Sequence, residues 1–331
     1  MTINNTIQSL VNLASPKMET KIIAYSDDFF GKVTRMLNDK EPVFIEDKFD
    51  NHGKWMDGWE SKRRRDGGND WAILKLGSPG IISKINIDTS YFTGNFPPYF
   101  SLEGLYSETD PKEDANWKTL IKKTNLIGDS KNNFELDSKE TLNFIRLQIF
   151  PDGGIARIRL FGEVKYNWNQ FNTNEIIELS SLKLGGSILA YNNAHYGDVS
   201  ALLSEGRGKT MGDGWETRRR REPGNDWIII KLAQKGNIER IEIDTAHFKG
   251  NYPDRASIQA RSIDKNITTK NLIQNSENWT IILDETKLSA DNIHTYKINS
   301  NSKNAATHIR LNIYPDGGVS RLRIFGTKLD D

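Results

Sequence analysis

The sequence predicts an all-β protein that consists of two tandem copies of one β-sandwich domain, each carrying a short helix. Two observations lead to this fold class. Long motifs of the first half recur in the second half in the same order, and apolar residues alternate with polar residues in most apolar segments. Alternation with a period of two is typical of strands that bury one face, so each copy is expected to be an antiparallel jelly roll.

The duplication covers nearly the whole chain. Residues 57–76 (DGWESKRRRDGGNDWAILKL) match residues 213–232 (DGWETRRRREPGNDWIIIKL) at 14 of 20 positions, with a shift of 156 residues. The shift is 166 residues for an upstream pair, AYSDDFFG and AYNNAHYG, and 164 residues for the downstream PDGG pair. Each copy is long enough to bury its own core. We therefore predict domains at 1–165 and 174–331, joined by a polar, Asn-rich segment.

Individual elements follow from the spacing of apolar residues. In the first copy, alternation predicts strands around 85–87, 145–149 and 158–160, and the second copy repeats these runs. The PDGG motif between two such runs predicts a hairpin turn, because Asp-Gly favours the required backbone angles. A helical spacing predicts one short helix in each copy. The helices would use Phe29, Phe30, Val33, Met36 and Leu37, with Asp27 or Asp28 as N-cap, and Tyr196, Val199, Leu202 and Leu203.

The composition excludes several classes of function. The chain has 45 basic and 44 acidic residues and a net charge of +1, so it lacks the positive field of a nucleic-acid-binding protein. It has no cysteine, which excludes disulfides, thiolate metal sites and a cysteine nucleophile. We find no secretion signal and no run of about 18 apolar residues. We therefore expect a cytoplasmic protein without nucleic-acid or membrane partners.

The densest candidate motif is DGWE followed by four basic residues, in both copies. A run of adjacent cations is usually a solvated loop. Here tryptophan and acidic residues flank the run, and alternate residues of an extended segment face opposite sides. Lys62 and Arg64 can therefore pair with local carboxylates while Arg63 and Arg65 bind an anionic ligand, or the reverse. Arginine suits planar carboxylates because it donates two parallel hydrogen bonds.

Two further motifs are duplicated. The pattern DTxxFxGN contains Asp88 and Asn95 in the first copy. It is either a strand end capped by Asp or Thr, or part of a site at the sandwich edge, where loops cluster. The pattern PDGGxxR contains Asp152 and Arg157, and we interpret it mainly as a turn.

One position inside DTxxFxGN distinguishes the copies, because Tyr91 corresponds to His247. Histidine titrates near neutral pH, so we expect the second copy to contribute more to proton transfer, with Asp244 orienting the ring. The alternative is that both rings only pack. The five histidines lack the spacing of a zinc site. The cofactor requirement stays open, including a carboxylate-bound Mn²⁺ or another divalent ion.

The order of motifs in each copy resembles the galactose-binding-like (discoidin-like) jelly roll. The strings WMDGWESKRRR, MGDGWETRRRR, IDTSYFTGNFP and IDTAHFKGNYP more specifically resemble the allantoicase family. This resemblance implies a homo-oligomeric hydrolase that converts allantoate into ureidoglycolate and urea in purine degradation. The residues alone leave two alternatives: a tandem module that only binds a ligand such as a glycan, and a hydrolase of another ureido or guanidino compound.

The chemistry of allantoate guides the choice of site residues. The substrate carries a carboxylate and two ureido groups on one carbon, so the site needs an arginine, hydrogen-bond acceptors and flat walls. It also needs groups that activate water and protonate urea. The candidate catalytic residues are Glu60, Asp88, Glu216, Asp244 and His247, where the two glutamates would activate water, bind a metal or only pair with arginines. The candidate substrate-binding residues are Trp59, Arg63, Arg65, Asn95, Trp215, Arg219, Arg221 and Asn251.

Overall fold

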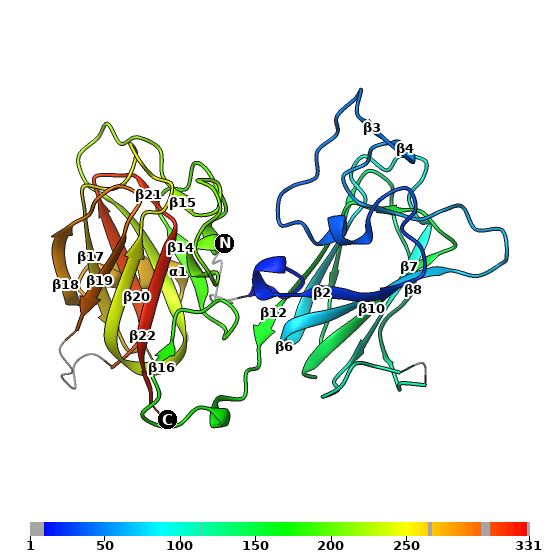
Figure 1. Ribbon diagram of the computed structural model, residues 1–331. Helices are drawn as coiled ribbons and strands as arrows, with labels where there is room; N and C mark the ends of the chain where they lie inside the picture. Colours follow the sequence, from blue (N-terminus) through cyan, green and yellow to red (C-terminus); the bar gives the residue numbers. More distant parts are fainter. Residues whose placement is uncertain (1–9, 113, 264–266, 299–304, 330–331) are drawn as a thin grey trace. The chain divides into compact units, whose positions relative to one another are not determined.

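The computed structural model describes residues 10–112, 114–263, 267–298 and 305–329. These residues divide into a first unit, Val11–Tyr166, and a second unit, which contains residues 167–329 and Leu10. In each unit eight strands form one antiparallel sheet (Figure 1). Among the described residues, no helix has the length and apolar character needed to cross a membrane.

The first unit contains strands and short 3-10 helices. Its strands are β1 (Val11–Asn12), β2 (Lys21–Tyr25), β3 (Phe49–Asp50), β4 (Gly53–Lys54), β5 (Trp59–Glu60), β6 (Asp70–Asp88), β7 (Tyr99–Leu105), β8 (Lys118–Asn125), β9 (Lys131–Glu135), β10 (Leu142–Phe150), β11 (Gly154–Ile155) and β12 (Arg157–Val164). Its 3-10 helices are η1 (Pro16–Met18) and η2 (Val33–Leu37).

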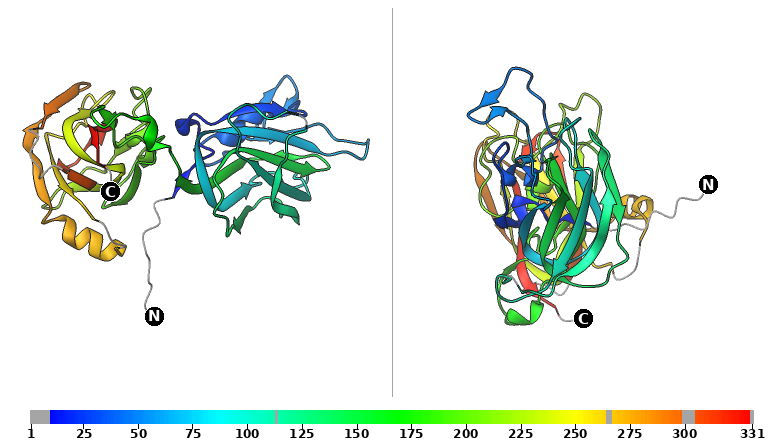
Figure 2. Two further views of the ribbon diagram at one scale, coloured as in Figure 1. Left: turned by 90° about the horizontal axis from the view of Figure 1, so that it is seen from below. Right: turned by 90° about the vertical axis from the view of Figure 1, so that its right-hand side faces the viewer.

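The second unit repeats this order and adds one α-helix. Its strands are β13 (Ile177–Glu178), β14 (Ser187–Tyr191), β15 (Trp215–Glu216), β16 (Asp226–Asp244), β17 (Arg255–Arg261), β18 (Thr280–Lys287), β19 (Ile293–Lys297), β20 (Ala305–Tyr314), β21 (Gly318–Val319) and β22 (Arg321–Lys328). Its helices are η3 (Trp168–Gln170), η4 (Val199–Leu203) and α1 (Thr269–Ser276). Figure 2 (left) shows α1, in orange, on the outside of the strands.

One long strand joins the two layers of each sandwich. The first half of β6 pairs with β2 and β10, and its second half pairs with β9 and β12. Its apolar residues alternate as the sequence predicts, since Leu74, Ile85 and Ile87 are buried. Burial of each such side chain contributes about 1.5–3 kcal/mol to stability. The predicted all-β jelly roll is therefore confirmed in both units.

The predicted helices are shorter than the apolar spacing indicates. Only η2 and η4 form, and Phe29, Phe30 and Tyr196 are exposed. The backbone N–H groups of Phe30 and Gly31 donate to the carbonyl oxygen of Glu60, at 3.1 and 3.0 Å. The backbone N–H groups of these two residues therefore bind β5 and are not available for the hydrogen bonds of a helical turn. The sequence also did not predict α1, which begins after its N-cap Thr268.

The PDGG motif does not form the predicted hairpin. Strand β10 pairs with β6 and β7, whereas β12 pairs with β1 and β6, so the two strands do not pair with each other. The short β11, which begins at the last glycine of PDGG, pairs with β5 instead. The prediction was wrong because the two alternating runs, in β10 and β12, pair with different halves of β6, and the chain between them crosses the end of the sandwich.

We expect the second unit to lose stability in acid because of one buried histidine. His308 in β20 is 7% exposed, and its burial, with a smaller effect of Lys231, lowers its pKa from 6.5 to about 4. The unfolded chain therefore binds a proton at a higher pH than the folded chain. The stability that the neutral, buried His308 contributes is complete above pH 6.5 and is lost as the pH is lowered. At pH 4.5 the free energy of unfolding should be lower by about 2–3 kcal/mol.

Denaturant unfolding of the wild type and of His308→Gln at pH 7 and pH 4.5 measures this effect. The glutamine variant should lack this part of the pH dependence. An identical loss of stability in both proteins would show that other groups cause it.

Candidate active site

The three duplicated motifs meet at one end of each sandwich. Glu60 lies in β5 opposite Gly154, the last residue of PDGG and the first residue of β11. The N–H of Gly154 donates to the carbonyl oxygen of Asn95, in the DTxxFxGN motif, at 2.7 Å. The second unit repeats this arrangement, since Gly318 donates to Asn251 at 2.8 Å. Motifs far apart in sequence therefore build one loop cluster per unit.

A glutamate–asparagine pair lies at the centre of each cluster. The side-chain amide of Asn95 donates to Oε1 of Glu60 at 2.7 Å, and Asn251 donates to Oε1 of Glu216. Glu60 is half-buried and Glu216 is 8% exposed. Loss of hydration raises the pKa of Glu60, which the hydrogen bond from Asn95 partly offsets. A carboxylate with a raised pKa is a better proton acceptor near neutral pH.

A glycine allows this close approach. Gly153 has a φ of 138°, a conformation that favours glycine. A Cβ atom at this position would lie 2.7 Å from the carbonyl oxygen of Asn95, and the equivalent Gly317 has a φ of 140°. Gly153 thus allows Asn95 to lie beside β5, and Gly317 allows Asn251 to lie beside β15.

The basic runs have one anchored arginine and exposed neighbours. Arg64 contacts Asp70 at 2.6 Å and Asp66 at 2.8 Å, and its backbone N–H donates to Asp152. The second unit repeats the anchor with Arg220, Asp226 and Asp316. The exposed neighbours, which form no ion pair among the described residues, are Arg63, Arg65, Arg219 and Arg221.

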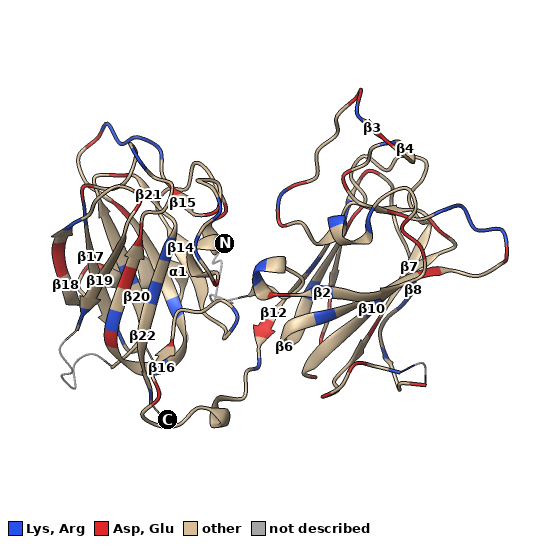
Figure 3. Ribbon diagram, viewed as in Figure 1, with Lys and Arg blue, Asp and Glu red and all other residues tan. Residues whose placement is uncertain are grey.

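These exposed arginines border open space. Figure 3 shows each basic run as a blue loop that projects from its own sandwich. In the first unit the run lines an open hollow of about 610 Å³ together with Asp27 and Asp66. Glu60 precedes the run by two residues but is not part of this hollow's lining. The arginines of the run therefore alternate between acid-paired and exposed, as expected for an extended segment. Glu60, in contrast, does not line the hollow that the arginines border.

The two predicted tryptophan walls lie elsewhere. Trp59 and Trp215 are fully buried, and their indole N–H groups donate to the carbonyl oxygens of Asp27 and Asn193, both at 2.8 Å. They therefore cannot line an open substrate site. They support β5 and β15 from the core instead.

Asp88 and Asp244 also lie behind the site. Both are buried, and their Oδ1 atoms accept the N–H groups of Ser90 and Ala246 at 2.8 Å. This geometry favours the alternative interpretation, in which these aspartates cap the end of β6 and of β16.

His247 contacts a carbonyl rather than the predicted aspartate. Its ring Nε2 lies 2.7 Å from the carbonyl oxygen of Gly208, so Nε2 carries the hydrogen because a carbonyl only accepts. Asp244 instead lies 3.4 Å from Arg207. His247 and Tyr91 share a positive φ, 70° and 68°. The contacts favour a packing role for His247 over proton transfer.

Replacement of His247 by asparagine tests this role. Asparagine tolerates a positive φ, so the backbone should persist. We expect a loss in kcat of less than about tenfold, similar to that of Tyr91→Phe. A selective loss of about 10²–10⁴-fold in His247→Asn, with a changed pH profile, would instead assign it proton transfer.

The first unit has a longer loop that sequence reasoning missed. The shift between the copies falls from 166 to 156 residues between Leu37 and Asp57, so this loop is ten residues longer than its counterpart. It carries β3, β4 and His52, whose ring stacks on Phe29 at 4.4 Å. A hollow of about 230 Å³ lies between Phe29, Phe30, Arg35 and His52. The change in shift was the signal for this difference between the units.

Within the described ranges, no three His, Asp or Glu side chains are grouped so as to hold a metal ion.

The fold and the site define a class: tandem jelly-roll proteins with a carboxylate–amide pair and exposed arginines at the loop end of each domain. The allantoicase repeat family model matches residues 11–165 and again residues 177–329. The chain therefore belongs to the allantoicase family.

Individual relatives agree with this assignment. The chain is 47% identical over 318 residues to a Burkholderia mallei protein named probable allantoicase 1, covering 96% of this chain and 94% of the relative. It is 46% identical over 321 residues to a probable allantoicase of Acinetobacter baylyi, covering 97% and 95%. A crystal structure of allantoicase from Saccharomyces cerevisiae has a TM-score of 0.82 and 32% identity, covering 98% of this chain and 94% of that chain.

Proposed function

We propose that the glutamate–asparagine pairs and the adjacent exposed arginines form the sites at which this chain acts on its substrate. As a member of the allantoicase family, the protein is a hydrolase that converts allantoate into ureidoglycolate and urea. The main support for this location of the site is the hydrogen bond from Asn95 to Glu60, which is repeated between Asn251 and Glu216.

The substrate's groups match the side chains of the loop clusters. An exposed arginine, Arg63 or Arg65 in the first unit and Arg219 or Arg221 in the second, binds the carboxylate of allantoate through two parallel hydrogen bonds. The amide oxygen of Asn95 or Asn251 accepts a ureido N–H. The arginine also fixes the orientation of the reacting carbon, which raises the effective concentration of the water nucleophile.

The glutamate carries the proton. Glu60 or Glu216 accepts a proton from water as the water oxygen bonds to the substrate's CH carbon and the bond from this carbon to a ureido nitrogen breaks. The same carboxyl then returns a proton to the departing nitrogen, so that urea leaves as a neutral molecule. Because urea is a poor leaving group, this protonation is essential.

A urea-release assay with purified protein tests the function. Allantoate should yield urea, whereas allantoin and ureidoglycolate should not, with and without added Mn²⁺. Release of urea only from another ureido or guanidino compound would assign a different hydrolase. Absence of any turnover by folded protein, with measurable affinity for a glycan, would assign a binding module.

We expect the exposed arginines to contribute mainly to substrate binding. Alanine at Arg63 or Arg65, or at Arg219 or Arg221, should lower kcat/KM about 10- to 100-fold, because a hydrogen bond to a charged group contributes about 1.5–3 kcal/mol. The effect should fall mainly on KM, with the melting temperature unchanged. If all four replacements leave kcat/KM within a few-fold of the wild type, each run is only a solvated loop.

The assembly and the location also follow from the proposal. We expect a homo-oligomer that works in the cytoplasm on a product of purine breakdown. Size-exclusion chromatography with light scattering measures the oligomeric state, and cell fractionation measures the location.

A further inference from the structure

The two units differ at one buried charge. In the first unit, Arg146 of β10 lies opposite Glu103 of β7 and bonds to its carboxylate at 2.5 Å. In the second unit the same register places Arg310 opposite Gln259, a neutral residue. Arg310 is 5% exposed and forms no ion pair among the described residues. A buried charge is normally paired with an opposite charge, whereas Arg310 only feels the charge of the exposed Glu277 without forming an ion pair with it.

Helix α1 explains the neutral partner. The side-chain amide of Gln259 donates to the carbonyl oxygens of Glu277 and Trp279, at 2.9 and 3.2 Å, in the segment that follows α1. A carboxylate has no hydrogen to donate there. Arg310 therefore keeps only neutral hydrogen-bond partners, Asn312 at 2.9 Å and Ser276 at 2.7 Å.

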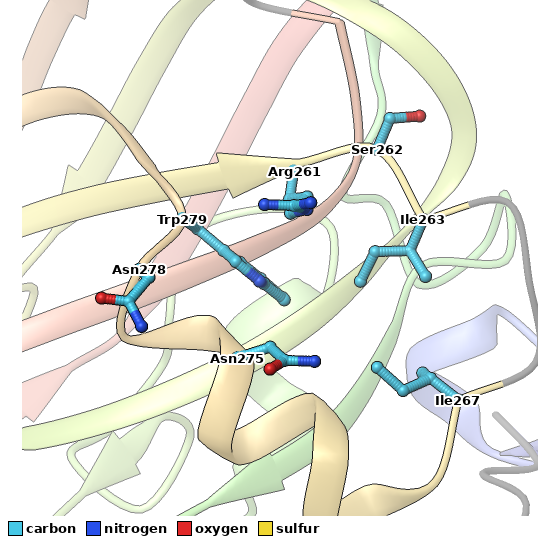
Figure 4. Close-up of a pocket in the computed structure, with 7 residues that line it drawn as sticks. All are labelled: Arg261, Ser262, Ile263, Ile267, Asn275, Asn278 and Trp279. Carbon is cyan, nitrogen blue, oxygen red and sulfur yellow. The ribbon is translucent and has the colours of Figure 1, made fainter.

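A cavity of about 470 Å³ lies beside α1, between this helix and the end of β17. In Figure 4 the indole of Trp279 lies between Arg261 and Asn275, with Ile263 and Ile267 on another side of the cavity. Ser276, which binds Arg310, directly follows Asn275 in α1. Among the described residues, the lining includes one cation and no acid.

Trp279 forms a buried part of the cavity wall. Trp279 is 3% exposed, yet its indole Nε1 has no hydrogen-bond partner among the described residues. A buried donor without an acceptor costs about 1–3 kcal/mol, and this Nε1 is also closed off from the open space of the cavity.

The cavity is separate from the proposed active site. Asn251 lies before the start of β17 and Arg261 is the last residue of this strand. Seven extended residues span about 20–24 Å, at about 3.4 Å per residue. A ligand in the cavity therefore does not reach the glutamate–asparagine pair.

We propose that this cavity is an accessory binding site for a small carboxylate that also carries an amide or ureido group. Arg261 binds the carboxylate, the Asn275 and Asn278 amides bind the ureido group, and the indole ring of Trp279 packs against the ligand. The ligand then belongs to the same chemical class as the proposed substrate and product, and this part of the proposal rests on the proposed function.

The test uses N-carbamoylglycine, a ureido carboxylate that has only one ureido group, and the full chain with Glu60→Gln and Glu216→Gln. Nitrogen-15 NMR follows the indole N–H signals of the eight tryptophans. The signal missing in Trp279→Phe belongs to Trp279. We expect N-carbamoylglycine to shift this signal saturably, neutral urea at the same concentration not to shift it, and Arg261→Gln to weaken the affinity at least tenfold.

Trp117 is the matched internal control. It precedes β8 as Trp279 precedes β18, and the guanidinium of Arg146 lies 4.8 Å from its ring, with the charge neutralised by Glu103. Its indole signal, identified with Trp117→Phe, should not move. An unmoved Trp279 signal, or an equal response in Arg261→Gln, would overturn the proposal. Because this readout needs no turnover, its failure is distinguishable from a failure to release urea from allantoate.

Discussion

Replacement of both Glu60 and Glu216 by glutamine is expected to lower kcat for allantoate by about 10²–10⁴-fold, the usual contribution of a general base. Glutamine keeps the shape of the side chain and an oxygen that can accept the hydrogen bond from Asn95 or Asn251. The melting temperature should therefore change little. The single variants show how much each unit contributes to kcat. Equal units predict that each variant keeps about half of kcat, whereas unequal units predict that one variant loses nearly all of it.

The pH profile provides the control for this prediction. Burial raises the pKa of Glu60, and a base must be ionised to accept a proton. kcat/KM should therefore fall as the pH drops through this raised pKa, and Glu60→Gln should lack that part of the profile if the first unit does the work. A fall in melting temperature with kcat within a few-fold of the wild type would show that the glutamates are structural.

Replacement of Arg157 by methionine is expected to destabilise the first unit by about 3–5 kcal/mol, because it breaks a buried ion pair and leaves one charge unpaired. Arg157 is fully buried and contacts the carboxylate of Asp57 at 2.6 Å. It also donates to the carbonyl oxygens of Asp57 and Lys40, at 2.6 and 2.8 Å. Methionine fills similar space but donates no hydrogen bond, so the acceptors lose their partner.

Denaturant unfolding measures this loss of stability. Two further variants serve as an equivalent case and as a control. Arg321→Met removes the equivalent contact with Asp213 and should destabilise the second unit in the same way. Lys84→Met removes an exposed ion pair with Glu135 and should have little effect, as is usual at a surface. A loss below about 1 kcal/mol in Arg157→Met would contradict the assigned role of the buried pair.

This pair also explains the PDGGxxR motif. Arg157 ties the strand after PDGG to Asp57 of the DGWE motif, and Asp152 of PDGG binds the backbone of Arg64. The sequence indicated a turn because Asp-Gly is such a strong local signal. The motif instead fixes the loop that carries Glu60 and the basic run.

The sequence by itself determined the duplication, the β-sandwich class and the family. These properties reside in local patterns: the alternation around Ile85 and Ile87 places one face in the core wherever the strand lies. The long identical motifs likewise need no coordinates to be aligned. The alternation of the basic run between paired and exposed residues also follows from its extended form, whereas the structure shows that Arg64 is the residue paired with Asp66 and Asp70.

Only the tertiary structure decided which motif residues reach a ligand. Trp59 and Glu60 are neighbours, yet β5 buries the indole and leaves the carboxylate beside Asn95. The alternation near position 60 favours burial of the indole, but it does not indicate that Glu60 meets Asn95, because that contact depends on the pairing of β5 with β11, more than 90 residues away. The same holds for Asp88, which the end of β6 turns inward. Contacts between segments distant in sequence, rather than residue type, therefore separated the supporting residues from the site.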